Sequence, residues 1–96
     1  PALSSDGATV FVGFSDNKLY AIYTTDEPDR RDVYGNLAEN AGDKKWDFET
    51  GGSLGSSSPT LSSDDNTVFI GSKDNKLYAI NVADGTKKWE FFQNQS

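Results

Sequence analysis

The stretch "VFIGSKDNKLYAI" (Val68–Ile80) repeats, almost letter for letter, the stretch "VFVGFSDNKLYAI" (Val10–Ile22). Aligning the chain with itself at an offset of 58 residues places Pro1–Tyr23 on Pro59–Asn81, and 16 of these 23 positions are identical. A match of this length and density in a short chain indicates an internal duplication. We therefore expect the fold to contain the same structural unit twice.

The alignment breaks after this stretch and resumes at a different offset. "KKWDF" (Lys44–Phe48) lies on "KKWEF" (Lys87–Phe91) at an offset of 43 residues, so the first copy carries an insertion of 15 residues at about 24–38. The sequence thus predicts two units, 1–58 and 59–96, built on a common repeat of 43 residues. A period of this size is typical of stacked or radial repeat architectures.

Each unit carries only β-strand signals. Short runs rich in β-branched and aromatic residues, such as "TVFVG" and "KLYAIY", are separated by an Asp-Asn turn that suits a tight hairpin. In the second unit the Asp84-Gly85 pair predicts a further hairpin, which leads into "KKWEFF". We therefore expect four antiparallel strands per unit, of which the first is short and the last carries the tryptophan.

The apolar pattern of the middle strands predicts that both faces of each sheet are covered. Val10 and Val12 lie on one face and Phe11 on the other, and Leu19 and Tyr20 likewise point to opposite faces. Four-stranded antiparallel sheets that are covered on both faces and repeat at this period are the blades of a β-propeller. A sandwich and a helix-covered sheet are the alternatives, but no stretch shows the 3.6-residue apolar period of a helix.

Composition narrows the classes of function. The chain has no cysteine and no histidine, which removes the commonest catalytic base and the thiolate metal sites. A net charge of −6 argues against nucleic acid, and no apolar run is long enough for a membrane span. Because the sequence contains no methionine and begins at Pro1, we expect a processed chain, an excised fragment or part of a longer protein.

One motif resembles a known family. The segment "AINVADGTKKW" places an alanine, a glycine and a tryptophan at relative positions one, seven and eleven, and the first copy matches once its insertion is removed. This spacing is similar to the tryptophan-docking motif of the quinoprotein-type propellers, the PQQ-like repeats. The resemblance implies a structural role for six residues: Ala21, Gly42, Trp46, Ala79, Gly85 and Trp89.

In that family the indole packs between adjacent blades, where alanine leaves room for the ring and glycine allows close backbone approach. The family includes dehydrogenases, which hold pyrroloquinoline quinone (PQQ) and calcium beside a pair of adjacent cysteines. It also includes scaffolds that bind no cofactor, among them an outer-membrane assembly lipoprotein and the sensor domains of membrane kinases. The repeat carries over to this chain, whereas the cysteine pair is missing.

The resemblance therefore implies a non-catalytic propeller scaffold or binding module. The alternative is a fragment of a PQQ-dependent dehydrogenase whose active site lies in missing blades. We expect no cofactor in this chain itself, with PQQ and calcium possible only in a complete parent propeller. The expected partners are further blades, by self-association or from a parent chain, and a protein or carbohydrate ligand, with no nucleic acid and no membrane span. The resemblance implies a periplasmic or extracellular location.

Two pairs of residues allow either a ligand-binding or a structural interpretation. Trp46 and Trp89 could form a stacking platform for a ring-shaped ligand, but their shared motif position favours packing between blades. The repeated aspartates Asp16 and Asp74 could bind calcium, but turn geometry explains them better. No residue is singled out as catalytic, cofactor-binding or metal-binding.

The insertion is a candidate binding loop, although a solvated loop of mixed charge is the simpler interpretation.

The number of blades leads to a further expectation. Two blades cannot close a ring, because propellers need about four to eight. The sequence therefore predicts that the outer faces of the two blades pack on further blades, as part of a larger propeller of eight blades or as an oligomeric ring.

Overall fold

The computed structural model describes residues 2–14, 16–52, 54 and 58–92. Parts of the two predicted units, namely residues 1, 15, 53, 55–57 and 93–96, lie outside the described residues. The described residues form two four-stranded antiparallel sheets and no helix, which confirms the predicted all-β architecture. Consequently, this part of the chain holds no helix with the length and hydropathy needed to cross a membrane.

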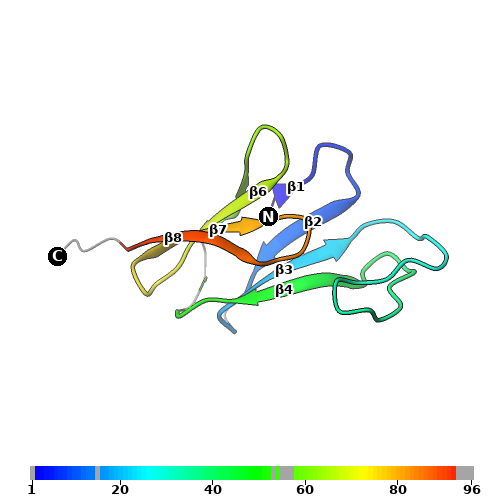
Figure 1. Ribbon diagram of the computed structural model, residues 1–96, viewed down its shortest axis with the longest axis horizontal. Helices are drawn as coiled ribbons and strands as arrows, with labels where there is room; N and C mark the ends of the chain where they lie inside the picture. Colours follow the sequence, from blue (N-terminus) through cyan, green and yellow to red (C-terminus); the bar gives the residue numbers. More distant parts are fainter. Residues whose placement is uncertain (1, 15, 53, 55–57, 93–96) are drawn as a thin grey trace.

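Each sheet is a simple meander in which every strand pairs with the next one along the chain (Figure 1). The first sheet contains β1 (Ala2–Leu3), β2 (Thr9–Gly13), β3 (Lys18–Tyr23) and β4 (Lys44–Glu49). The second contains β5 (Thr60–Leu61), β6 (Thr67–Gly71), β7 (Lys76–Asn81) and β8 (Lys87–Phe92).

The two sheets share one register. Ala21 on β3 lies opposite Trp46 on β4, and Ala79 on β7 lies opposite Trp89 on β8. In both sheets a bulge follows this pair and shifts the last strand by one residue. The tryptophan therefore stands at the same point of the pleat in each copy, facing a side chain small enough to leave room for an indole.

The hairpin turns follow the residues that the sequence provides for them. Asn17 (φ 70°) and Asn75 (φ 66°) take the left-handed backbone conformation in the turns before β3 and β7. Gly42 (φ 93°) and Gly85 (φ 76°) do so in the turns that lead into β4 and β8. Each of these turns connects two antiparallel strands. The repeated turn residues therefore have the same backbone conformation in both sheets.

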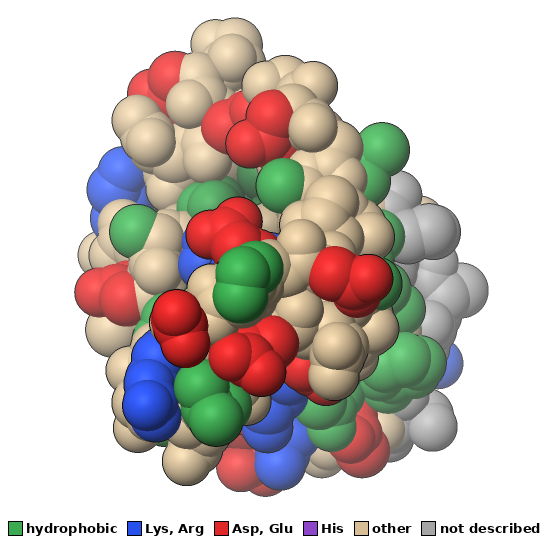
Figure 2. Space-filling model, turned by 90° about the vertical axis from the view of Figure 1, so that its right-hand side faces the viewer, with side chains coloured by type: hydrophobic (Ala, Val, Ile, Leu, Met, Phe, Trp, Pro, Cys, Tyr) green, Lys and Arg blue, Asp and Glu red, His purple; other side chains and the backbone are tan. Residues whose placement is uncertain are grey.

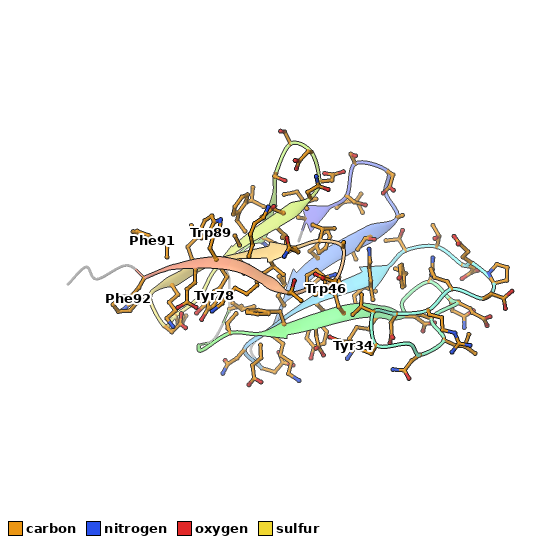
Figure 3. The ribbon with its side chains drawn as sticks, in the orientation of Figure 1. Tyr34, Trp46, Tyr78, Trp89, Phe91 and Phe92 are labelled. Carbon is orange, nitrogen blue, oxygen red and sulfur yellow. The ribbon has the colours of Figure 1, made fainter. Side chains whose placement is uncertain are left out.

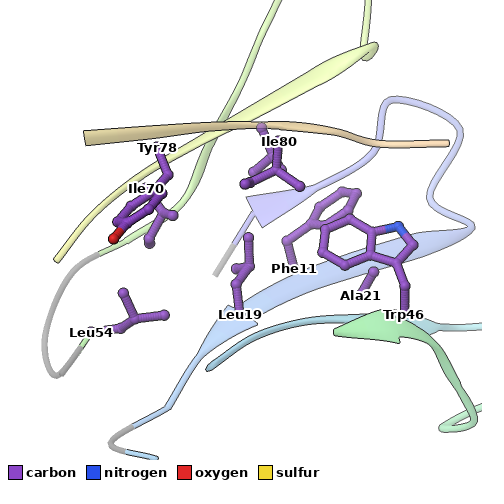
Figure 4. Packing of buried hydrophobic residues seen from close by; sticks show 9 residues of the cluster. Phe11, Leu19, Ala21, Trp46, Leu54, Ile70, Tyr78 and Ile80 are labelled. Atoms are coloured by element: carbon purple, nitrogen blue, oxygen red, sulfur yellow. The ribbon is translucent and has the colours of Figure 1, made fainter. Parts of the chain in front are cut away.

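The hydrophobic core lies between the two sheets (Figures 1 and 4). Side chains from both sheets and from the connection between them form one cluster, whose buried members are Phe11, Leu19, Ala21, Trp46, Leu54, Val68, Ile70, Tyr78 and Ile80. Only one face of each sheet contributes to it. The other two faces are where the two copies differ.

Candidate functional site

Trp46 fills the centre of the contact between the sheets. Its side chain is fully buried, its Nε1–H donates a hydrogen bond of 2.8 Å to the Val82 carbonyl, and its ring lies 5.9 Å from that of Phe11. The indole also covers Gly85, where an added Cβ would lie 2.5 Å from ring carbon Cδ2. Glycine is required at this position both by its positive φ and by the closeness of the ring.

Trp89 has the same neighbours within its own sheet but nothing above it among the described residues. Its ring lies 6.0 Å from Phe69 and opposite Ala79, as Trp46 lies beside Phe11 and opposite its alanine. In Figure 3, Trp89 and Phe91 point away from the first sheet. Trp89 is 44% exposed. The two tryptophans therefore have equivalent neighbours within their own sheets, but only Trp46 is covered by another sheet.

The docking face is the face of each sheet that carries the tryptophan. In the first sheet it consists of Phe11, Leu19, Ala21, Trp46 and Phe48, and in the second of Phe69, Leu77, Ala79, Trp89 and Phe91. The second sheet covers the first of these two faces. On the second, three large side chains are exposed: Leu77, Trp89 and Phe91.

The receiving face is the opposite face, onto which a docking face packs. In the second sheet it consists of Val68, Ile70, Tyr78 and Ile80, all of which are buried. The equivalent residues of the first sheet are Val10, Val12, Tyr20 and Ile22, all of which are only partly buried. The contact is therefore head-to-tail: one docking face and one receiving face are paired, and one of each is left over.

A tyrosine on each receiving face is held by a turn aspartate. Tyr20 donates a hydrogen bond of 2.6 Å to Asp16, and Tyr78 donates one of the same length to Asp74. The bond to the carboxylate, with burial second, raises the pKa of Tyr20 to about 12. For Tyr78 burial is the first cause of the raised pKa and the hydrogen bond is the second. The two receiving faces thus share the hydrogen bond between tyrosine and aspartate, but the tyrosine is more accessible to solvent in the first sheet than in the second.

The connection between the sheets adds contacts that sequence reasoning missed. Leu54 is fully buried and lies against Gly13, where an added Cβ would be 3.0 Å from its own Cβ. Ser5 donates its backbone N–H to Asp65 across the sheets at 2.9 Å. A single leucine inside a run of Gly and Ser was the available signal for the first contact. The second had no signal, because it joins two turns that are 60 residues apart.

The repeated aspartates hold turns together. Asp6 accepts a hydrogen bond of 2.7 Å from the Ser4 hydroxyl and one of 2.9 Å from the Ala8 N–H, and Asp64 has equivalent partners. The bond from the serine hydroxyl is the main reason why the pKa of each carboxyl is lowered. Among the described residues no three candidate ligands group together as a metal site would require.

The insertion leaves the hairpin that carries it intact. Gly42 donates its N–H to the Tyr23 carbonyl at 2.7 Å, as Gly85 donates to the Asn81 carbonyl at 2.8 Å. The Tyr23 N–H in turn bonds the Asp43 carbonyl at 2.9 Å. The extra residues therefore leave and rejoin the strand pair at its end without changing how β3 meets β4.

The insertion is folded against the end of the first sheet. The guanidinium of Arg30 lies 3.7 Å from the centroid of the Tyr23 ring, and its Nε donates to the carbonyl of the buried Ala38 at 2.8 Å. The Tyr34 hydroxyl both donates to the Asp47 carbonyl and accepts from the Asp47 N–H, at 3.1 Å each. The insertion therefore satisfies backbone groups on the outer edge of β4.

The outer surface of this end of the molecule carries acidic, basic and apolar side chains (Figure 2). Figure 2, which looks at it directly, shows Asp and Glu side chains gathered around isolated hydrophobic ones. Tyr34 and Leu37 are more than half exposed here. Charge and exposed apolar groups are thus mixed, and no pocket occurs among the described residues.

The structure is similar to a solved propeller. BamB from Moraxella catarrhalis matches 98% of this chain with a TM-score of 0.68, at 15% sequence identity. The two sheets are β-propeller blades. We refer to the first sheet as blade 1 and the second as blade 2. At this identity the likeness shows the fold alone, and the chain spans 24% of the length of that BamB chain.

A sequence relative matches over a shorter segment. Protein Rv3035 from Mycobacterium tuberculosis (strain ATCC 25618 / H37Rv) is 50% identical over 32 residues, which are 33% of this chain and 8% of the length of Rv3035. No family model matches the chain. The chain thus corresponds to a small part of each of these two proteins.

The six predicted motif residues fall into one assembled set and one open set. Ala21 and Trp46 of blade 1 meet Gly85 of blade 2 at the contact between the blades. Ala79 and Trp89 meet each other on the bare docking face. The sixth residue, Gly42, belongs to blade 1 and contacts no indole. Nothing is within 4 Å of the position that a Cβ there would take.

Proposed function

We propose that the chain is a non-catalytic β-propeller unit, a scaffold or binding module whose bare faces pack on further blades. One observation carries the proposal: the docking face of blade 2 has the composition of the docking face of blade 1, yet Trp89 is 44% exposed whereas Trp46 is fully buried. Contiguous apolar surface of this kind marks association sites in soluble proteins. An equivalent surface is buried by a blade within the same chain, which supports a blade as the partner.

The six motif residues act in this proposal as a tryptophan-docking motif of the PQQ-like kind. The indole of Trp46, the carbonyl of Val82 and the backbone of Gly85 support that role. Membership of the PQQ-like family and an extracytoplasmic location belong to the same proposal, and the motif resemblance supports them. Detection of the parent protein in a periplasmic or secreted fraction tests the location.

Nothing among the described residues favours the dehydrogenase alternative, which places the active site in missing blades. The family's adjacent cysteine pair is missing, and the chain has no histidine. The described carboxylates that repeat with the blades are engaged in turns, as those of Asp6 and Asp64 are. Titration with PQQ and calcium, followed by the absorbance of the quinone, should show no saturable binding. Stoichiometric binding at micromolar concentration would favour the dehydrogenase instead.

Joining two copies in one polypeptide tests the docking role. A linker of the sequence 50–59 should bring Trp89 of the first copy onto blade 1 of the second, at the millimolar effective concentration that short tethers provide. With all other tryptophans replaced by phenylalanine, we expect that indole to become protected from acrylamide and its emission to shift to the blue. An indole as accessible as in the single chain would contradict a docking role of this face toward the blades of this repeat.

A further inference from the structure

The free docking face of blade 2 and the free receiving face of blade 1 match each other in detail. Every member of the bare docking face is identical to its counterpart in the contact inside the chain. On the receiving face Val10, Tyr20 and Ile22 are identical to Val68, Tyr78 and Ile80. The one change is Val12 in place of Ile70, which removes a single methylene. The chain therefore carries both halves of an interface that it already forms once.

The receiving side also has a vacant position for an indole. Gly42 has the backbone conformation of Gly85, with φ 93° against 76°, and the space over its Cα is empty where Trp46 fills the space over Gly85. Glu39 precedes Gly42 by three residues, as Val82 precedes Gly85. Its carbonyl accepts one hydrogen bond, of 2.7 Å from Glu27, and keeps a second lone pair for an indole N–H.

The receiving face of blade 1 is preorganised as well. The bond of 2.6 Å from Tyr20 to Asp16 fixes this ring as the equivalent bond fixes Tyr78. Phe14 packs edge-on against Tyr20 at 5.2 Å and is half exposed, which adds apolar surface that blade 2 lacks. One inter-blade bond has no equivalent, because Gly7 stands where Asp65 accepts from Ser5.

We infer that the partner of the bare docking face is blade 1 of a second copy of this chain, joined head-to-tail. This inference rests on the proposed function and names the partner that it leaves open. Because the two faces lie on different blades, the contact is heterologous: it extends into a ring or an open chain and cannot close as a two-fold dimer. Trp89 of one copy lies over Gly42 of the next.

Two variants that each lose one face test the inference. Trp89→Glu alters the docking face and Val12→Glu alters the receiving face, and their like charges prevent the altered faces from attracting each other. Sedimentation velocity should show concentration-dependent assembly of the wild type, and each variant should lower the association constant at least about tenfold. A 1:1 mixture of the variants should form a two-chain species, because one intact docking face meets one intact receiving face.

Matched controls keep the result decisive. Leu37→Glu alters an exposed side chain on the insertion, outside both faces, and should assemble like the wild type. Leu77→Glu provides a second docking-face variant, and circular dichroism checks that each variant is folded. A monomeric wild type, or a mixture that stays monomeric, would overturn the inference. If the joined two-copy chain nevertheless protects Trp89, the proposed function stands and only the second copy as partner is wrong.

Discussion

Trp46 of blade 1 and Trp89 of blade 2 stand in nearly the same local sequence, and each lies opposite an alanine and beside a phenylalanine of its own blade. One indole is fully buried and the other is 44% exposed. The receiving faces show the reverse: Tyr78 of blade 2 is buried, whereas Tyr20 of blade 1 is partly open. The comparison separates what a blade determines by itself from what its neighbour adds.

Strand pairing and turn geometry belong to the blade itself. Register, bulge and hairpin turns are the same in both copies, although different side chains are covered. Burial, by contrast, depends on the adjacent blade, as expected for repeats in which each unit covers only its neighbour. A two-blade chain thus provides a covered copy and an uncovered copy of one face in a single molecule.

The largest contrast should come from the tryptophans. Trp46→Ala should lower the free energy of unfolding by about 3–5 kcal/mol, because it leaves a cavity between the blades. Trp89→Ala should lower it by only about 1 kcal/mol in the monomer, since much of that ring is already in water. Urea unfolding at a concentration where the chain is monomeric measures both. Equal losses would show that the exposed indole is more constrained than its position indicates.

The two turn glycines provide the next contrast. Gly42→Ala should cost about 1–2 kcal/mol, the price of a positive φ with a side chain. Gly85→Ala should cost about 1–3 kcal/mol more than that, because the new methyl group also meets the Trp46 ring. The same unfolding measurement compares them. An identical effect of both substitutions would mean that the indole shifts freely away from Gly85.

The repeated strands could be predicted from the sequence because each signal is local. The Asp-Asn and Asp-Gly turns and the two-faced apolar runs fix the strands, and the 43-residue period fixes the sheets. Which tryptophan is covered could not be read in this way. Trp46 and Trp89 have nearly the same neighbours in sequence, and the difference arises from Gly85 and Val82, which belong to another blade.

The insertion shows a second limit. Its charges predict a solvated loop, and most of its residues are exposed. Its fold rests on pairings of side chain with backbone, such as Arg30 with the Ala38 carbonyl and Tyr34 with both backbone groups of Asp47. Pairings of this kind leave no periodic trace in a sequence, so the shape of the loop could not be derived from it.

Removing residues 24–38 should have a smaller effect than the glycine substitutions. The hairpin is already closed between Tyr23 and both Gly42 and Asp43, so the shortened chain keeps its strand pair. The lost contacts are mostly exposed hydrogen bonds, and a shorter loop recovers a little entropy, so we expect a net change within about 1 kcal/mol. Thermal unfolding measures it. A fall of many degrees in the melting temperature would show that the insertion supports the core.

The smallest effect should appear in the tyrosine titrations. The pKa of Tyr20 is raised to about 12, chiefly by its bond to Asp16, so Asp16→Asn should lower it toward 10. Asp74→Asn should change the pKa of Tyr78 less, because burial is its first cause. Since folding raises the pKa of Tyr20, the stability that this group contributes is present below pH 10 and is lost as the pH rises toward 12. Absorbance at alkaline pH follows both ionisations, and equal shifts would contradict the assigned causes.

The most direct measurement is acrylamide quenching of two single-tryptophan chains, Trp89→Phe and Trp46→Phe. The first reports Trp46 and should resist quenching at every protein concentration, because blade 2 of the same chain covers the indole. The second reports Trp89 and should be quenched readily when dilute and become protected as the chain concentration rises. Two indoles with equal accessibility at all concentrations would contradict the account, because covered and bare copies of one docking face would then not exist.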